Sequence, residues 1–244
     1  IPAEEILARK RNPGPACGTP VPFSLLKNAD EQTVVGISAV LHAIDAFRLA
    51  PGGTPEPFRP WGIVAAPRFI GRDNIARMVT EFRAEGPIAV SPHAIPHRTM
   101  HSPSGALSLA LGIRGPNYGA GGGPGTEAEG LLSGLSLLCG RHLPGLWLLL
   151  TRIDPLTPTD HSGAITPGTR AEAVALALAP VGSGWSGPLL ELVAGPAEDA
   201  PSLTLDSLRA LLASGSGSCA LPGFGPALVR NFVTTQLLAL GYRA

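Results

Sequence analysis

The residues with the clearest chemical potential lie between Gly112 and Leu132, in the stretch GIRGPNYGAGGGPGTEAEGLL. A dense glycine cluster there precedes a segment that we expect to be helical from Thr126. Free N–H groups at a helix start can bind a carboxylate, a phosphate or a thioester oxygen. Gly122, Gly123, Gly125 and Thr126 are therefore a candidate ligand-binding site. Glycines also let a backbone turn tightly beneath a neighbouring element, and this structural interpretation stays open.

The familiar phosphate-binding motifs are not completed by this stretch. A G-x-G-x-x-G pattern that starts at Gly119 and Gly121 would need glycine where Pro124 stands, and a Gly-Lys-Ser/Thr ending is absent. We therefore predict no cofactor. Thr126 is predicted to be an N-cap, because Glu129 three residues later would complete a T-x-x-E capping box.

Three histidines recur at every fourth residue, and on an unbroken helix His93, His97 and His101 would share one face as metal ligands. This stretch is interrupted by Pro92, Pro96 and Pro103. No carboxylate or cysteine lies close in sequence to complete a metal site. We predict no metal and expect solvated or hydrogen-bonded histidines.

Two further sets of reactive residues do not form a recognisable pattern. His161 stands beside Asp160 and Ser162, but sequence neighbours rarely have the geometry of a catalytic triad. The three cysteines are Cys17, Cys139 and Cys219. They are widely separated and form no CxxC pair, which argues against a disulfide framework and against a zinc site.

Composition narrows the class of protein. Apolar residues make up 44% of the 244 residues and charged residues 15%, which is typical of a globule with extensive buried surface. Eighteen basic and eighteen acidic side chains cancel, so we expect no nucleic-acid partner. The longest strongly apolar run, Leu146 to Leu150, is far shorter than the roughly 20 residues of a membrane span. With no secretory-type apolar segment near position 1, we expect a cytoplasmic protein.

Hydrophobic periodicity predicts alternating helices and strands, and hence a layered α/β arrangement. We expect helices in TVVGISAVLHAIDAFRLA, RDNIARMVTEFRAEG, Thr126 to His142, LTLDSLRALLA and PALVRNFVTTQLLALG. We expect strands in WGIVAAP, LWLLLTRID and RAEAVALALAPV. Residues 1–32, with several prolines, are predicted to be an irregular entry segment.

The stretch VSPHAIPHRTMHSPSGALSLALGIRGPN, Val90 to Asn117, resembles β-ketoacyl synthases. In that family a Ser-Pro pair, an Ile-Pro pair, a small-residue helix and a Gly-Leu-Arg-Gly-Pro-Asn turn precede the catalytic cysteine. The resemblance extends over residues 33–180 and implies the N-terminal half of a thiolase-like fold, a mixed sheet with helices packed on it. Residues 181–244 are then a Gly/Pro-rich linker and a helical tail that packs on this domain. The family's histidine-bearing carboxyl half has no recognisable counterpart.

The family places its cysteine seven residues after the Asn of the turn, at a helix start that stabilises a thiolate. Counting seven from Asn117 gives Pro124, which is flanked by glycines. Thr126, the nearest hydroxyl, would need an adjacent base. The resemblance therefore implies a degenerate synthase-like protein without the catalytic nucleophile, more a pseudoenzyme than an enzyme.

Partners also follow from the resemblance. It implies an accessory subunit of a fatty-acid- or polyketide-type pathway that binds an active ketosynthase or an acyl carrier protein, whose phosphate or acidic surface Arg72 and Arg83 would contact. Such arginines are also common on the solvated face of a helix. Synthases of this family dimerise through the strand before the nucleophile, here YGAGGG, so a homo- or heterodimer is implied, although glycine weakens strands.

Two other functions stay open. One is an acyltransferase or hydrolase that reuses the scaffold, which would need a Ser or Thr within hydrogen-bond reach of one of the histidines. The other is a module that binds an acyl thioester, which would need an open groove lined by Leu107, Leu109 and Leu111.

Overall fold

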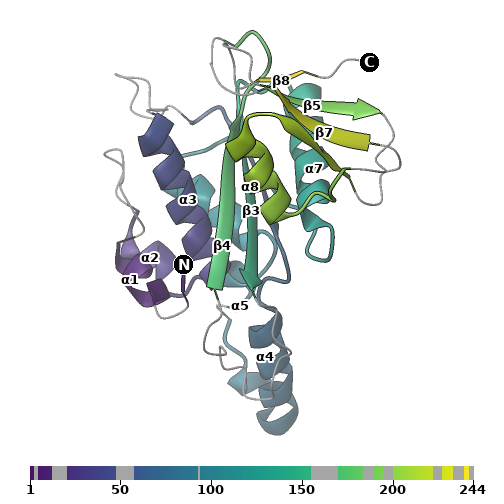
Figure 1. Cartoon of the computed structure of the whole chain (residues 1–244). Helices are drawn as coiled ribbons and strands as arrows, with labels where there is room; N and C mark the ends of the chain where they lie inside the picture. The colour runs from purple at the N-terminus through teal and green to yellow at the C-terminus, as the bar shows by residue number, and fades with distance from the viewer. Residues whose placement is uncertain are drawn as a thin grey trace.

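The structure is a computed structural model that describes residues 1–2, 5–12, 21–47, 58–92, 94–154, 170–183, 189–194, 200–221, 227–232 and 239–241 (Figure 1). Its helices are α1 (Ile6–Arg11), α2 (Phe23–Leu26), α3 (Glu31–Phe47), α4 (Arg72–Glu85), the short 3-10 helix η2 (Pro87–Ala89), α5 (Ala94–His97), α6 (Ser102–Leu111), α7 (Thr126–Gly140) and α8 (Leu205–Ser214). Its strands are β1 (Gly62–Pro67), β2 (Asn117–Gly119), β3 (Leu146–Asp154), β4 (Arg170–Leu178), β5 (Leu189–Ala194), β6 (Gly217–Ala220), β7 (Ala227–Phe232) and β8 (Ala239–Gly241).

The central element is a mixed four-stranded sheet with the order β2-β1-β3-β4. Strands β2, β1 and β3 are parallel, with Val64 opposite Tyr118 on one side and Leu148 on the other. Strand β4 runs antiparallel to β3. The long apolar runs of β1 and β3 are buried, as expected for strands covered on both faces. The predicted α/β class and mixed sheet are confirmed.

Helices cover both faces of this sheet, so the side chains of each strand alternate between two cores. Ile63, Trp147 and Leu149 face the core that contains α3 and α6. Val64 and Leu148 face the core that contains α7 and α8. The resulting three layers are seen in Figure 1, where α3 lies on one side of β3 and β4 and where α7 and α8 lie on the other.

The C-terminal part differs from the predicted helical tail. Helix α8 is present, but most of the stretch predicted as a second helix lies in strands β7 and β8 or outside the described residues. These strands belong to a second sheet with the order β6-β7-β5-β8. Leu205, Leu208 and Leu211 of α8 contribute to the same core as α7, so residues 205–214 are an integral part of the packing.

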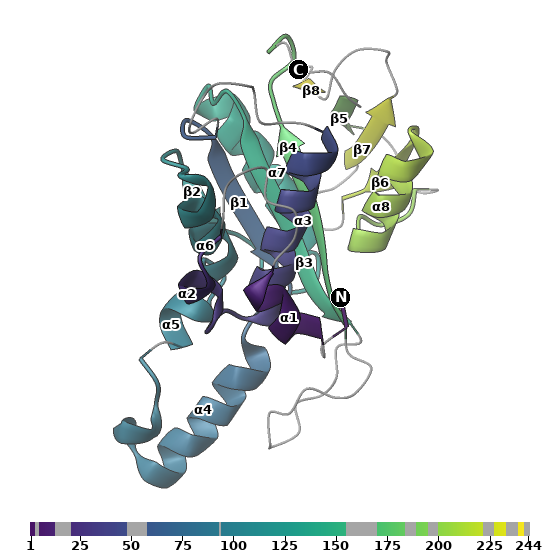
Figure 2. The same ribbon diagram turned by 90° about the vertical axis from the view of Figure 1, so that its left-hand side faces the viewer.

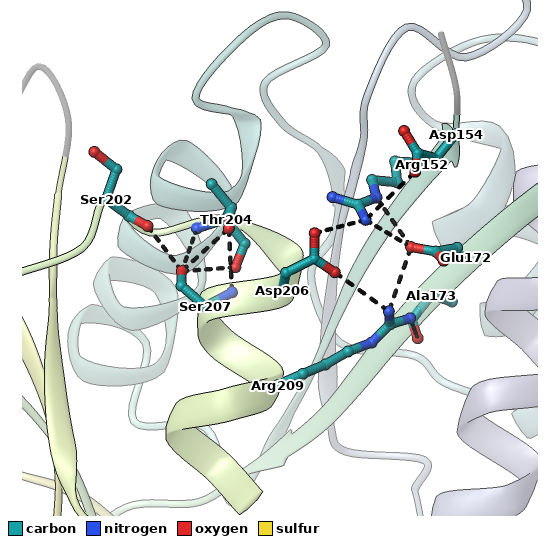
Figure 3. A network of polar contacts seen from close by, with 9 residues as sticks. All are labelled: Arg152, Asp154, Glu172, Ala173, Ser202, Thr204, Asp206, Ser207 and Arg209. Carbon is teal, nitrogen blue, oxygen red and sulfur yellow. Dashed lines mark hydrogen bonds and ion pairs between the residues drawn. The ribbon is translucent and has the colours of Figure 1, made fainter.

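An ionic network reinforces the contact between α8 and the first sheet (Figure 3). Arg152 Nη2 lies 2.9 Å from Glu172 Oε2 and 2.8 Å from Asp206 Oδ2. Arg209 Nη1 lies 3.3 Å from the same Glu172 oxygen. Burial alone would lower the pKa of Arg152, but Asp206 and Glu172 raise it above its ordinary value. The network therefore joins β3, β4 and α8 through charges that are mutually neutralised.

Helix α4 projects away from the body of the molecule, together with η2 (Figures 1 and 2). Gly71, with a φ of 67°, is the N-cap of α4, and Gly86, with a φ of 77°, is its C-cap. We refer to residues 72–89 as the arm. The predicted helix and its end at Gly86 and Pro87 are confirmed.

The entry segment is more regular than its prolines indicate, because α1 and α2 both form there and Ile6 and Leu26 are buried in the core under α3. No helix within the described residues is both long and apolar enough to cross a membrane.

Candidate functional site at the carboxyl ends of the parallel strands

The glycine loop follows β2 and leads into α7, as the sequence predicts. Gly121, Gly122 and Gly125 have positive φ angles of 75°, 109° and 81°, which favour glycine because it has no Cβ. A Cβ added at Gly121 would collide with the hydroxyl of Thr126. Gly121 is therefore needed so that the backbone can turn tightly beside Thr126, which is the structural role considered in the sequence analysis.

The predicted capping box at Thr126 is wrong. Gly125 is the N-cap of α7, and Thr126 is the first helical residue. Its hydroxyl accepts a hydrogen bond from the N–H of Gly122 at 2.8 Å, so it ties down the loop instead of the helix start. Thr126 is also buried, which leaves its hydroxyl a poor nucleophile for a substrate outside the loop.

Pro124, by contrast, is exposed, and the loop around it is open. A Cβ built on Gly123 or Gly125 would meet no other atom within 4 Å. The position at which the family resemblance places a nucleophile thus has room for a side chain. It carries a proline ring, which can neither donate a proton nor attack a carbonyl.

The loops after β1 and β2 and the end of β3 meet at one edge of the sheet, which is where open α/β sheets bind ligands. Phe69 N–H donates to Gly122 O at 3.1 Å, and Arg68 N–H donates to Thr151 O at 2.8 Å. Gln32, at the start of α3, donates to Arg68 O at 2.9 Å and accepts from the Thr151 hydroxyl at 2.8 Å. We call this region the strand-end site.

A buried carboxyl group lies beside this site. Asp30 precedes α3, where its Oδ1 accepts the N–H of Gln32 at 2.9 Å and its own N–H donates to His97 O at 3.3 Å. Burial, followed by the charge of Glu31, raises the pKa of Asp30 from 3.8 to about 7, against smaller opposing effects of the Gln32 N–H and of Arg98. The sequence analysis missed Asp30 and Gln32, because the predicted helix started at Thr33 and not at Glu31; an Asp directly before a helix is an N-cap signal.

The two arginines predicted to contact a carrier protein do not form one site. Arg72 and Arg83 lie eleven positions apart on α4, which corresponds to about 16 Å along a helix. Arg72 instead lies near Arg68, since the guanidinium carbon of each is 5.7 Å from the centre of the Phe69 ring. Arg83 is at the far end of the arm.

The histidines are dispersed. His93 and His161 lie outside the described residues. His97 is in α5, and His101 is exposed just before α6. Ser104 Oγ lies 3.2 Å from His101 Nδ1 and 3.1 Å from its carbonyl oxygen. Within the described parts of the chain, no group of three or more His, Cys, Asp or Glu residues could hold a metal ion.

The groove predicted for an acyl-binding module is not formed by the three leucines. Leu107 and Leu111 are buried under α6, whereas Leu109 is 75% exposed. Positions two apart on a helix point in different directions, so Leu109 cannot line a surface with the other two.

Comparisons with known proteins give a structural likeness only. No family model matches the chain, and no curated protein matches it. Among solved structures, the chain is similar to a chain of the complex of a ketosynthase (ApeO) with its chain length factor (ApeC) from Xenorhabdus doucetiae, with a TM-score of 0.56 and 14% identity over 95% of this chain and 92% of that one.

Two further structures are similar over part of the chain. One is a type II polyketide synthase acyl-carrier protein in complex with its ketosynthase bound to the hexaketide (AntDE:AntF), with a TM-score of 0.42 and 20% identity over 53% of this chain and 37% of that chain. The other is the ishigamide ketosynthase/chain length factor, with a TM-score of 0.40 and 15% identity over 52% and 35% of the two chains. The chain thus spans little more than a third of these two matched chains. The Xenorhabdus match alone shows that the fold of this chain is similar to the thiolase-like ketosynthase fold.

Proposed function

We propose that the chain is a non-catalytic, ketosynthase-like subunit that pairs with an active ketosynthase in a polyketide- or fatty-acid-type pathway. The observation that carries this proposal is the chemistry at the start of α7. An acyl-transferring nucleophile needs a thiol or an activated hydroxyl there, and the exposed position carries Pro124. Of the two cysteines in the described part of the chain, Cys139 lies at the other end of α7 and Cys219 is buried in β6.

The size of the Xenorhabdus match supports the same proposal. It covers nearly all of both chains, so the matched chain is close in length to this one. That structure is a complex of a ketosynthase with a chain length factor, and we infer a corresponding role as the companion of a larger catalytic subunit.

Exposed apolar side chains on the arm supply a surface for such a partner. Ile75, Val79 and Phe82 are spaced along one side of α4 and are each exposed by more than two fifths. Ile88 in η2 is 94% exposed. Exposure of apolar side chains to water is unfavourable, and a second protein that covers this side of the helix would remove that cost. In the proposed complex, this side of the arm contacts the ketosynthase.

A hydrolase or acyltransferase is the second candidate, because Ser104 and His101 satisfy the distance criterion for a nucleophile and base. Ser104 is fully buried, however, and its hydroxyl also donates to the carbonyl oxygen of His101. That arrangement at the first turn of α6 is typical of local side chain to backbone bonding at a helix start. The pair therefore favours a structural role, and Ser104→Ala should leave any thioester turnover unchanged.

Affinity purification from the native host, followed by mass spectrometry of the bound proteins, tests the proposal. We expect an intact ketosynthase to be recovered, and to be lost with Phe82→Ser on the arm. Leu7→Ser, which removes an even more exposed apolar side chain from α1, is the control and should retain the partner. A chain that is always solitary and turns over acyl thioesters would overturn the proposal.

A further inference from the structure

Lysine is rare in this chain, and its lysines lie together. The eighteen basic residues comprise sixteen arginines and only two lysines, Lys10 and Lys27. These two residues are 17 positions apart, but Lys10 Nζ donates to Lys27 O at 3.4 Å. Because Lys10 is in the last turn of α1 and Lys27 is the C-cap of α2, the bond brings the ends of the two helices together.

Helices α1 and α2 lie side by side at the surface and each exposes one bulky apolar side chain (Figure 1). Ile6 and Leu26 are buried in the same core as α3 and hold the two helices against the protein. The residues that the helices expose are Leu7, with 60% of its surface accessible, and Phe23, with 48%. The two helices therefore present apolar side chains to the solvent from a fixed base.

Each exposed apolar side chain lies on the same side of its helix as a cation. Residues three and four positions apart are neighbours on a helix surface, so Leu7 lies beside Lys10 and Arg11. Phe23 and Lys27 are neighbours for the same reason, and the backbone N–H of Lys27 donates to Phe23 O at 2.9 Å. We refer to Leu7, Lys10, Arg11, Phe23 and Lys27 as the α1–α2 patch.

The positive charge of the patch is not neutralised by neighbouring carboxylates. Residues 6–29 contain four basic side chains and no acidic one. Among the described residues, no carboxylate forms an ion pair with Lys10, Arg11 or Lys27. The charge of Lys10 lowers the pKa of Asp30, but that carboxyl is buried and does not cover the patch. Cations in the last turn of a helix also stabilise its carbonyl groups, which does not account for the exposed apolar side chains beside them.

This combination of side chains fits a lipid surface better than a protein surface. Protein interfaces are depleted of lysine and enriched in arginine, whose planar group binds carboxylates with two parallel hydrogen bonds. The chain uses arginine at sixteen positions, yet both of its lysines are in this patch. At a membrane surface, bulky apolar side chains enter the headgroup region, while cations on flexible stems remain among the anionic headgroups.

We propose that the α1–α2 patch binds the surface of an anionic lipid membrane. Leu7 and Phe23 enter the headgroup region, and Lys10, Arg11 and Lys27 contact the anionic headgroups. The contact is peripheral and reversible, because so few apolar side chains need the added attraction of the cations. The inference is independent of the proposed function, since the patch is separate from the arm and needs neither a ketosynthase partner nor a missing nucleophile (Figures 1 and 2).

Co-sedimentation of the full chain with vesicles tests this proposal. One set of vesicles contains phosphatidylcholine alone, and the other contains equal parts of phosphatidylcholine and phosphatidylglycerol. We expect binding to the anionic vesicles only, and less of it as sodium chloride is added. Lys10→Gln and Lys27→Gln should each weaken binding by about fivefold, because each removes one charge near the lipid surface. Phe23→Ser should weaken binding at every salt concentration and leave its salt dependence unchanged, because it removes apolar surface and no charge.

Arg83→Gln and Ile88→Ser are the matched controls, since they remove a cation and an exposed apolar side chain from the arm. Circular dichroism establishes that each variant is folded. Loss of binding in the patch variants and not in the arm variants supports the proposal. Absence of binding to the anionic vesicles, equal binding to both sets of vesicles, or equal weakening in patch and arm variants would overturn it. Recovery of the ketosynthase with Lys10→Gln is expected to be unchanged, so the two proposals can fail separately.

Discussion

Replacing Asp30 with asparagine should make the protein more stable at and above neutral pH. Asp30 is buried, and its pKa is raised from 3.8 to about 7, mainly by burial and next by the charge of Glu31. A carboxyl whose pKa is higher in the folded state binds its proton more tightly there. Its contribution to stability is therefore complete below pH 4 and is lost as the pH rises to about 7.

The size of the effect follows from the shift. One pKa unit corresponds to about 1.4 kcal/mol, so the shift of Asp30 corresponds to roughly 4 kcal/mol as an upper limit. Asparagine carries no charge at any of these pH values, and its side-chain oxygen can still accept the N–H of Gln32. Since Asn and Asp cap helices about equally well, the variant and the wild type should differ little near pH 4.

Urea denaturation at half-unit steps from pH 4 to pH 8, followed by circular dichroism, measures this difference. The free energy of unfolding of Asp30→Asn minus that of the wild type should increase through this range and become constant above pH 7. Glu31→Gln should move the wild-type loss of stability to lower pH, because it removes a charge that raises the pKa of Asp30. Asp45→Asn, an exposed charge on the same helix, is the control. Equal pH profiles for Asp30→Asn and the wild type would refute the reasoning.

Three further substitutions test the packing that positions the strand-end site, each by urea denaturation. Arg152→Ala should cost about 2 kcal/mol because it leaves Glu172 without its strongest partner, whereas Arg77→Ala, in an exposed pair, should cost less than about 0.5 kcal/mol; equal costs would contradict the role of the network. Leu107→Ala should cost about 3 kcal/mol, as expected for a fully buried leucine, and a cost no larger than that of exposed Leu109→Ala would be inconsistent with the core. Gly121→Ala should destabilise the protein by more than about 1 kcal/mol, because it combines a positive φ with a collision against a hydroxyl; an unchanged midpoint would be evidence against the tight loop.

Long apolar runs made much of the first sheet predictable. The runs in β1 and β3 are buried on both faces, and their order along the chain with α4 and α7 was sufficient for the layered class. The stretch PALVRNFVTTQLLALG was misread because its apolar spacing suits either a helix or a strand. Pairing of β7 with β5 and β6, which is a tertiary contact, decides in favour of the strand.

The candidate site was predicted only in part. The glycine loop and the helix start were visible as a local pattern, but the predicted cap at Thr126 was wrong, because Gly125 adopts a left-handed conformation and takes the N-cap position. The bonds from Gln32 to Arg68 and Thr151 span 36 and 119 residues. No local pattern joins residues so far apart, and only the fold brings them to the same edge of the sheet.

Transfer of a labelled acyl group tests the central claim most directly. The chain, in a Cys139→Ser background that removes the exposed thiol, is incubated with its co-purified ketosynthase and a labelled acyl thioester, and both polypeptides are analysed by intact-mass spectrometry and peptide mapping. The account predicts an acyl adduct on the ketosynthase and none on this chain. An adduct on the peptide that contains Pro124 and Thr126, or at Ser104, would contradict it.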